Sequence, residues 1–328
     1  MGGFNIKELI TQAGVRNVIS RYGLMPKKKL GQHFLVDSHV LEKILNAAEV
    51  GEGDLVLEVG PGVGALTQGL LERVGNTGHV IAVELDRQLI PVLTELFASA
   101  GGNISVIQGD ILRLDLQELL TPFLSSKDLS GNSFMHTKML PDSETFSCAS
   151  DSFRTGLNKT VKVVANLPYY ITTPVILSLL ESSLPLESIT VMIQKEVAQR
   201  MAASPGTKDY GSLTLAVQYH ATVYMAANVP VNCFVPRPGV DSAVVHLKIL
   251  KTPPVPDADK SELFKVIHAS FQQRRKTLVN ALDSAGFGKG KDTLHSALES
   301  CGLDPQVRGE KLDLFQFAKL TRVLGAIK

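Results

Sequence analysis

A glycine-rich turn between a strand and a helix constrains this chain more than any other feature. Residues 55–67 read LVLEVGPGVGALT, so an apolar, β-branched run passes directly into three glycines at alternate positions. Glycine adopts backbone conformations closed to other residues and lets a ligand approach the main chain closely. The pattern is typical of the first strand–turn–helix unit of an open α/β sheet that binds a nucleoside cofactor.

Short β-branched runs and helical stretches alternate along the chain after residue 50. The predicted strands are residues 55–59, 79–84, 104–108, 161–165 and 189–193. The helices predicted around them are residues 37–49, 64–74, 86–99, 173–182 and 195–203. Because this alternation builds a parallel sheet covered by helices, we expect a Rossmann-like α/β domain over residues 30–252. A later antiparallel pair, residues 213–225 and 243–250, is expected to extend the sheet.

Three other segments have a different character. Residues 1–29 form a basic leader with six Lys or Arg side chains against one Glu. Residues 125–159 are polar and lack an apolar period, so we expect a surface insertion there. A proline-rich linker at 252–257 precedes an all-helical domain over residues 257–328. Its helices are predicted at residues 260–271, 273–285, 291–300 and 313–326.

Charge and composition limit the partners of the chain. The formal net charge is only +1, so a nucleic acid would have to be bound by local basic clusters. Two triplets are predicted to contact RNA phosphates, although such runs also suit a solvated surface. These triplets are Lys27, Lys28 and Lys29, and Arg274, Arg275 and Lys276.

Cysteine use indicates a reducing compartment, and the apolar runs of the chain bear on membrane association. The three cysteines lie far apart, which argues against a disulfide framework or a zinc site, and we expect no metal. No apolar run approaches the roughly 18 residues that a membrane span needs. We therefore expect a cytoplasmic protein that does not associate with membranes. We also expect the protein to act as a monomer.

Acidic residues end the second and third predicted strands. Glu84 comes 24 residues after Gly60, the distance at which a carboxylate can bind both hydroxyls of a ribose. Asp110 follows the next strand and can accept a hydrogen bond from an adenine amino group. Because the carboxyl ends of parallel strands meet at one edge of a sheet, both acids are expected beside the glycine turn.

Two ligands compete for this glycine pattern. A dinucleotide requires G-x-G-x-x-G, and Ala65 in the last position is tolerated by a looser form of that fingerprint. S-adenosyl-L-methionine (SAM) fits the form E-x-G-x-G-x-G better, with Glu58 on the strand and Gly60, Gly62 and Gly64 in the turn.

The tetrapeptide Asn166-Leu167-Pro168-Tyr169 follows the fourth strand and should face the reactive end of the cofactor. The lone pair of an adenine N6 is delocalised, so this nitrogen is a poor nucleophile. The Asn166 side-chain oxygen and the Leu167 carbonyl can accept its two N–H bonds and favour a pyramidal nitrogen. Pro168 stiffens the turn, and Tyr169 offers a face on which the base can stack. A structural turn at the end of a strand is the alternative.

A second aromatic residue stands in residues 234–242, which read FVPRPGVDS. The prolines hold this segment extended. Phe234 suits the other wall of a base slot and suits packing in the core equally well.

These motifs together resemble the bacterial KsgA family of 16S rRNA (adenine-N6,N6)-dimethyltransferases, over about residues 20–328. The motifs are KLGQHFL at 29–35, EVGPGVGALT at 58–67, Glu84, Gly109-Asp110, NLPY at 166–169, the 234–242 segment and FQQRRK at 271–276. The resemblance implies a seven-stranded SAM-dependent methyltransferase domain and a helical rRNA-binding domain. It implies dimethylation of two adjacent adenosines in the 3′-terminal hairpin loop of 16S rRNA within a pre-30S particle.

The resemblance also implies roles for individual residues. Gln32, His33 and Leu35 would touch the methionine side of the cofactor, together with Gly60. Glu84 would hold the ribose, and Asp110, with its neighbour Ile111, would hold the adenine. Asn166 would border the cofactor and position the target N6, while Tyr169 and Phe234 would sandwich the flipped base. His33 departs from the Asn that stands at this position in many members.

Two other functions fit the same motifs. An Erm-type enzyme would methylate an adenine of 23S rRNA, although residues 271–276 favour the small subunit. A non-catalytic assembly or transcription factor could keep the fold, but the intact Asn166 and Glu84 argue against it.

Overall fold

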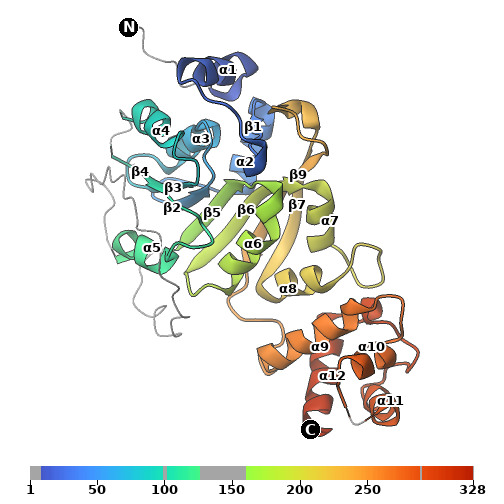
Figure 1. Ribbon diagram of the computed structural model, residues 1–328. Helices are drawn as coiled ribbons and strands as arrows, with labels where there is room; N and C mark the ends of the chain where they lie inside the picture. The colour runs from blue at the N-terminus through green and yellow to red at the C-terminus, as the bar shows by residue number, and fades with distance from the viewer. Residues whose placement is uncertain (1–8, 99–101, 126–159, 289, 328) are drawn as a thin grey trace. The chain divides into compact units, whose positions relative to one another are not determined.

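The computed structural model describes residues 9–98, 102–125, 160–288 and 290–327 (Figure 1). The insertion predicted at 125–159 lies outside these ranges apart from its first residue. None of the helices within them is both long and apolar enough to cross a membrane. The described chain divides into two compact units. The larger comprises residues 1–198 and 224–249, and the smaller comprises residues 199–223 and 250–328.

A seven-stranded sheet with the order β4-β3-β2-β5-β6-β9-β7 confirms the predicted α/β class. The strands β2 to β6 pair in parallel, and β9 pairs antiparallel with β6. Their bounds are β2 Leu55–Val59, β3 His79–Glu84, β4 Ile104–Gln108, β5 Val161–Asn166, β6 Leu186–Gln194, β7 Ala221–Val229 and β9 Ser242–Ile249. Because β2 and β3 are buried along their whole length, their sequences are nearly continuous apolar runs.

Helices lie on both sides of this sheet (Figure 1). They are α2 Ser38–Ala47, α3 Ala65–Val74, α4 Ile90–Leu96, α5 Leu116–Ser125, α6 Thr172–Glu181 and α7 Lys195–Met201. The glycine turn leads from β2 into α3, as predicted, and a short 3-10 helix, η4 (Tyr169–Ile171), leads from β5 into α6. The carboxyl ends of β2, β3, β4 and β5 therefore meet at one edge.

The described part of the basic leader, residues 9–29, packs within the larger unit. Its helix α1, Gln12–Arg21, is capped by Thr11, whose hydroxyl accepts the Gly14 N–H at 3.0 Å. Val15 and Val18 are buried in the same hydrophobic cluster as α2 and α3. The leader continues through η2 (Lys28–Leu30) into the short strand β1, Phe34–Leu35.

β1 brings together two motifs that lie about two hundred residues apart in the chain. It pairs antiparallel with β8, Phe234–Val235, which follows the 3-10 helix η5, Val231–Cys233. The pairing places Leu35 opposite Phe234. The residues before β1 therefore lie beside the proline-containing segment after β8.

The strand predicted over residues 213–225 is wrong in its first half. Residues Ser212–His220 form the helix α8, and β7 begins only at Ala221. The apolar residues of α8 alternate like those of a strand. The helix nevertheless buries Leu213, Thr214, Leu215, Val217 and Tyr219, which lie around most of its circumference. A helix buried on so many sides loses the 3.6-residue period that would have revealed it.

The smaller unit is helical, in agreement with the all-helical prediction for the C-terminal residues. Its other elements are α9 Lys260–Gln272, α10 Leu278–Ser284, α11 Lys291–Ser300, η6 Gly309–Lys311 and α12 Leu314–Ile327. The core of this unit also includes Tyr210, whose hydroxyl donates to the Leu312 carbonyl at 2.8 Å. Residues 199–223, which the sequence suggested belong with the sheet, therefore contribute to the helical core.

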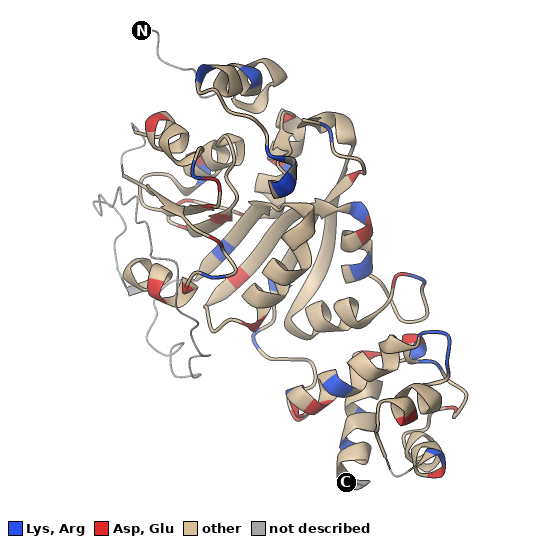
Figure 2. Ribbon diagram, in the orientation of Figure 1, with Lys and Arg blue, Asp and Glu red and all other residues tan. Residues whose placement is uncertain are grey.

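The second helix of this unit starts later than the predicted residue 273. Thr277 is its N-cap and accepts the Asn280 N–H, so α10 begins at Leu278. Arg274, Arg275 and Lys276 consequently lie in the turn between α9 and α10 (Figure 2).

Candidate active site

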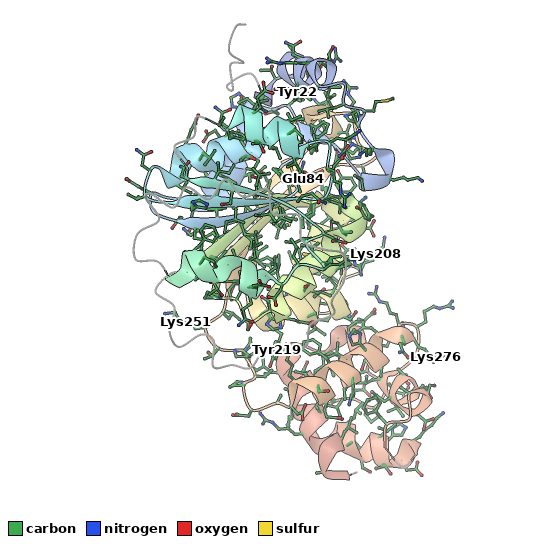
Figure 3. All side chains as sticks on the ribbon, turned by 60° about the vertical axis from the view of Figure 1, so that its left-hand side comes forward. Tyr22, Glu84, Lys208, Tyr219, Lys251 and Lys276 are labelled. Carbon is green, nitrogen blue, oxygen red and sulfur yellow. The ribbon has the colours of Figure 1, made fainter. Side chains whose placement is uncertain are left out.

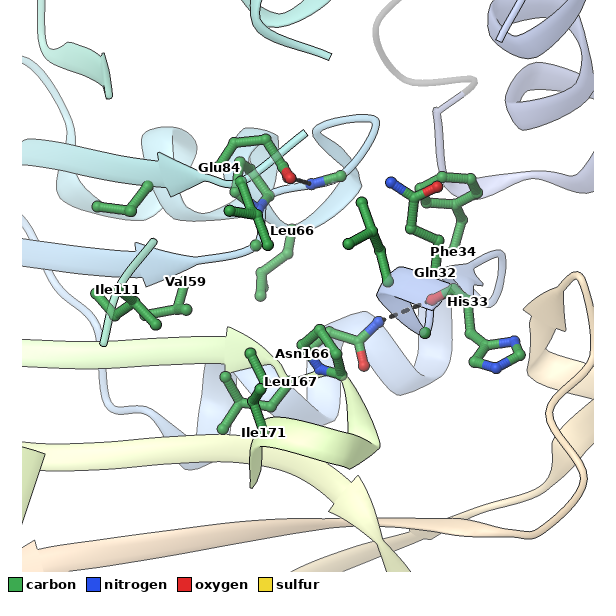
Figure 4. Close-up of a pocket in the computed structure, with 18 of the residues that line it drawn as sticks. Gln32, His33, Phe34, Val59, Leu66, Glu84, Ile111, Asn166, Leu167 and Ile171 are labelled. Atoms are coloured by element: carbon green, nitrogen blue, oxygen red, sulfur yellow. Dashed lines mark hydrogen bonds between the residues drawn. The ribbon is translucent and has the colours of Figure 1, made fainter. Parts of the chain in front are cut away.

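A pocket opens at the edge where the parallel strands end (Figure 4). Residues 30–35, the glycine turn after β2, and the residues that follow β3, β4 and β5 all line it. The predicted site residues on its wall are Gln32, His33, Leu35, Gly60, Gly62, Glu84, Asp110, Ile111, Asn166, Leu167, Pro168 and Tyr169. Segments predicted separately from four motifs thus share one cavity.

The glycine turn requires glycine for two reasons. Gly60, Gly62 and Gly64 have φ values of 70°, 59° and 88°, in the left-handed region that L side chains rarely adopt. A Cβ on Gly62 would lie 3.1 Å from the Phe34 ring, and one on Gly64 would lie 2.7 Å from the Phe97 ring. Gly64 does not itself line the pocket. Gly64 is instead the N-cap residue of α3. Gly60 and Gly62 line the cavity with their backbone.

Glu84 is held at the end of β3 by the glycine turn. One carboxylate oxygen accepts the Gly62 N–H at 3.1 Å, and the other accepts the Asp86 N–H at 2.8 Å. Burial raises the pKa of Glu84 to about 7. Its carboxyl group can still accept hydrogen bonds from a ligand, because each oxygen has a further lone pair. Asp110 also lines the cavity, and its carboxylate accepts the Leu112 N–H at 3.0 Å.

Gln32 joins the leader to this acidic edge. Its side-chain oxygen accepts the Lys27 N–H at 2.7 Å, and its nitrogen donates to Asp86 at 2.9 Å. The Lys27 ammonium lies 2.7 Å from the other Asp86 oxygen. Burial acts to raise the pKa of Asp86, but hydrogen bonds from Lys27 and Gln32 hold it below its usual value. Lys27, predicted to bind RNA, is therefore engaged in an ion pair.

Asn166 at the end of β5 is oriented by the segment before β1. Its side-chain nitrogen donates to the His33 carbonyl at 3.0 Å (Figure 4). Since that bond uses the amide nitrogen, the side-chain oxygen remains as the acceptor that this residue presents to the pocket. The neighbouring Leu167 N–H donates to the Met192 carbonyl on β6 at 3.1 Å, which fixes the backbone of the turn.

Two contacts fix the position of the Tyr169 side chain, one through its hydroxyl and one through the face of its ring. Its hydroxyl is 2.7 Å from that of Ser242, a fully buried residue at the start of β9. Its ring faces the His33 imidazole, with 5.9 Å between ring centroids and 30° between ring planes.

Phe234, expected as the second wall of a base slot, does not line the pocket. Its exposed fraction is 1%, and it packs in the core of the larger unit. Pairing of β8 with β1 turns its side chain inward. Of the two roles that the sequence left open, core packing is the one this structure shows.

Glu58 also lies away from the cavity, fully buried in the middle of the sheet. Burial raises the pKa of its carboxyl from 4.5 to about 8, and Thr67 on α3 is its polar neighbour. The group is consequently protonated at neutral pH. Its predicted contact with a cofactor stays a prediction.

The buried Glu58 carboxyl predicts an unusual pH dependence of stability. Between pH 4.5 and about 8 the native chain keeps a proton that the unfolded chain has lost. The free energy of unfolding should therefore fall as the pH rises through this window. We expect Glu58→Gln to remove about 3–5 kcal/mol of that fall, as measured by chemical unfolding at several pH values. The exposed Glu72→Gln is the matched control; an unchanged pH profile for Glu58→Gln would contradict the assignment.

Tyr170 is among the pocket residues that sequence reasoning missed. Tyr170 is 53% exposed and lines the cavity. Burial, and then the nearby charges of Asp110 and Glu84, raise its pKa. Gly31 is the sequence feature that could have indicated this contact. A Cβ added to Gly31 would lie 3.3 Å from Pro168 and 3.5 Å from Tyr170. That close crossing brings the 29–35 motif onto the NLPY turn.

The three members of the basic triplet in the helical unit differ in their surroundings. The Arg274 guanidinium donates to the Lys208 and Tyr210 carbonyls at 2.9 Å, so it clips a loop to the helices. Arg275 and Lys276 are exposed, and Figure 3 shows Lys276 at the outer surface of this unit. Lys29 is exposed as well, whereas the Lys28 side chain lies outside the described residues.

The fold and the pocket define a class of protein. A parallel sheet with a glycine turn after its first strand and acids after the next two is the architecture of the Rossmann-like SAM-dependent methyltransferases. A family model described as ribosomal RNA adenine dimethylase matches residues 24–322. The chain therefore belongs to the ribosomal RNA adenine dimethylase family.

Individual relatives agree with this assignment. The chain is 46% identical to the ribosomal RNA small subunit methyltransferase A of Lachnoclostridium phytofermentans, over 94% of each chain. It is 41% identical to the protein of that name from Bacillus cereus, over 97% of this chain and 98% of the relative.

Solved structures show the same fold. A dimethyladenosine transferase from Plasmodium falciparum superposes with a TM-score of 0.64 at 25% identity, covering 87% of this chain and 95% of that one. The 23S rRNA methyltransferase ErmE superposes with a TM-score of 0.58 at 22% identity, covering 89% and 99%.

Proposed function

We propose that this protein transfers methyl groups from SAM to the N6 atoms of two adjacent adenosines in the 3′-terminal hairpin loop of 16S rRNA. The observation that carries the proposal is Asn166, whose amide is fixed by the His33 carbonyl in the pocket that Glu84 borders. The names of the relatives favour the small ribosomal subunit. We further propose that the protein acts as a monomer in the cytoplasm, on a pre-30S particle, and contributes to 30S biogenesis.

The residues of the pocket suit SAM. A ligand can lie against Gly62 because the turn has no side chain there, and the same turn holds the Glu84 carboxylate. Glu84 would accept from the two ribose hydroxyls and Asp110 from the adenine amino group, with Ile111 against the ring. When bound, SAM supplies a methyl group that its sulfonium has already activated.

The chain then has to make a poor nucleophile react. Asn166 and the Leu167 carbonyl would each accept one N–H of the adenine, which favours a pyramidal nitrogen with its lone pair directed away from them. Tyr169, held by Ser242, would support the ring of an unstacked base. Positioning and preorganised hydrogen bonds can supply most of such a rate enhancement, since the methyl group needs no further activation.

The direct test incubates the protein and labelled SAM with 30S and 50S subunits from a strain that lacks these modifications. We expect label in 16S rRNA only, at two adjacent adenosines, with dimethyladenosine as the final product. Label in 23S rRNA would instead identify an Erm-type enzyme. Binding to the particle without any transfer would favour a non-catalytic assembly factor.

The basic turn of the helical unit gives a second prediction. Arg275→Ala and Lys276→Ala should leave stability unchanged but lower the salt dependence of 30S binding by roughly one counterion each. Arg274→Ala should instead lower the free energy of unfolding of the chain by about 1–2 kcal/mol, since two carbonyls lose their donor. Thermal unfolding and binding measured at several salt concentrations separate the two effects. If all three variants showed the same stability and the same salt dependence of binding, the structural role assigned to Arg274 would be contradicted.

A further inference from the structure

Asp86 connects two segments of the pocket wall without lining the pocket itself. One of its carboxylate oxygens accepts the side-chain N–H of Gln32 at 2.9 Å, and its backbone N–H donates to a Glu84 carboxylate oxygen at 2.8 Å. Gln32 and Glu84 both line the pocket (Figure 4), whereas Asp86 does not. A single acidic residue therefore contacts both the segment before β1 and the end of β3.

The Asp86 carboxylate is buried, so its charge needs partners. The exposed fraction of its side chain is 4%, and an unpaired carboxylate at such a site would be costly. The Lys27 ammonium lies 2.7 Å from the oxygen that Gln32 does not use, and the Gln88 N–H donates to that oxygen at 3.1 Å. Lys27 is thus the cation that balances this buried charge.

Lys27 and Asp86 together fix the orientation of the Gln32 amide. The Lys27 backbone N–H donates to the Gln32 side-chain oxygen at 2.7 Å, while the Gln32 nitrogen donates to Asp86. Because both ends of the amide are bonded, it cannot turn over without losing two hydrogen bonds. The second N–H of the Gln32 nitrogen stays available to an acceptor on a ligand.

We propose that Asp86 is a positioning residue for SAM, which acts through Gln32 at one end of the cofactor and Glu84 at the other, with Lys27 as its counter-ion. This deepens the proposed function and rests on it. Gln32 would donate its remaining N–H to the carboxylate of the methionine chain, and Glu84 would accept from the ribose. Lys27 then serves the cofactor site instead of the RNA phosphates that its triplet predicts.

The same contacts give the ion pair an electrostatic effect on Glu84. Burial is the main cause of the raised pKa of Glu84, and the negative charge of Asp86 raises it further. Lys27 offsets that charge. The other titratable groups around Glu84 are Glu58 on β2, which is protonated at neutral pH, Asp110 after β4, and Tyr170 in η4.

Removing either member of the ion pair should therefore move the titration of Glu84 in opposite directions. Lys27→Met leaves the charge of Asp86 unbalanced, so the pKa of Glu84 should rise. Asp86→Asn removes that charge, so the pKa of Glu84 should fall. SAM affinity decreases when Glu84 takes up a proton, and the pH midpoint of this decrease reports the change. A residue that merely anchored the leader would move neither midpoint.

The test measures SAM affinity by titration calorimetry from about pH 5.5 to about pH 9. We expect the midpoint to lie about half a pH unit above that of wild type for Lys27→Met, and about as far below it for Asp86→Asn. At the upper end of the range Glu84 is ionised in each variant, so only the positioning of Gln32 is measured there. Asp86→Asn should bind SAM about tenfold more weakly than wild type, and Lys27→Met within about threefold of it.

Two further variants serve as controls. Lys27→Arg keeps the cation and should behave as wild type. Arg87→Met removes an exposed cation next to Asp86 in the chain and should leave the midpoint unchanged. The Lys27 side chain is 40% exposed, so Lys27→Met tests the proposal even if Asp86→Asn fails to fold.

The proposal is overturned if Lys27→Met leaves the midpoint at its wild-type value, if the two midpoints move in the same direction, or if Asp86→Asn binds SAM as tightly as wild type at high pH. Failure of the wild-type protein to bind SAM would instead contradict the proposed function, so the two failures are distinguishable.

Discussion

Replacing Asn166 by Ala should reduce the rate of methyl transfer by about 100- to 1000-fold, the loss typical of removing one preorganised hydrogen-bonding group from an active site. The variant keeps the backbone turn, whose Leu167 N–H is bonded to Met192 on β6. It loses the side-chain oxygen that accepts from the target amine and the bond to the His33 carbonyl. The defect should therefore appear in single-turnover rates at saturating SAM and saturating 30S.

Asn228→Ala is the matched control, because Asn228 is exposed on β7 in the same unit. Binding of SAM to Asn166→Ala, measured by titration calorimetry, should change far less than the transfer rate. A variant that transfers methyl groups as fast as wild type would show that the mechanism assigned to Asn166 is wrong.

Replacing Glu84 by Ala should lower SAM affinity about 100-fold or more. Two charge-assisted hydrogen bonds to a ribose, at about 1.5–3 kcal/mol each, disappear with this carboxylate. The change also releases the Gly62 N–H from its partner, so the glycine turn loses a support. Titration calorimetry at neutral pH measures the effect, with the exposed Glu118→Ala as control.

The pKa of Glu84 adds a pH dependence to this prediction. Because the free carboxyl titrates at about 7, protonation competes with ribose binding below that pH. SAM affinity should fall as the pH decreases through 7, by up to about tenfold per unit. Glu84→Gln should bind SAM weakly and lose this dependence. SAM affinity within threefold of wild type for Glu84→Ala would contradict the ribose assignment.

The sheet was predictable because each parallel strand is a short apolar run. β2 and β3 are buried on both faces, so their sequences needed no interpretation of periodicity. The acids Glu84 and Asp110 followed from the rule that parallel strands end at one edge. α8 was misread because a helix buried on most sides shows no helical period.

The inner wall of the pocket depends on contacts that no local pattern contains. The place of Phe234 follows from pairing between β1 and β8, about two hundred residues apart. The contact between His33 and Tyr169 follows from the same pairing, together with the bond from Asn166 to the His33 carbonyl. Likewise, the sequence gives no reason to assign different roles to Arg274 and Arg275. The difference comes from the loop carbonyls of Lys208 and Tyr210, which accept hydrogen bonds from Arg274.

A crystal structure of the protein with SAM bound tests the central idea most directly, namely that one pocket brings an activated methyl group to the acceptor atoms of the NLPY turn. We expect the ribose on Glu84, the methionine chain against Gly62 and residues 32–35, and the methyl group directed toward the Asn166 side-chain oxygen. A donor bound elsewhere, or one whose methyl group points away from Asn166, would contradict the account.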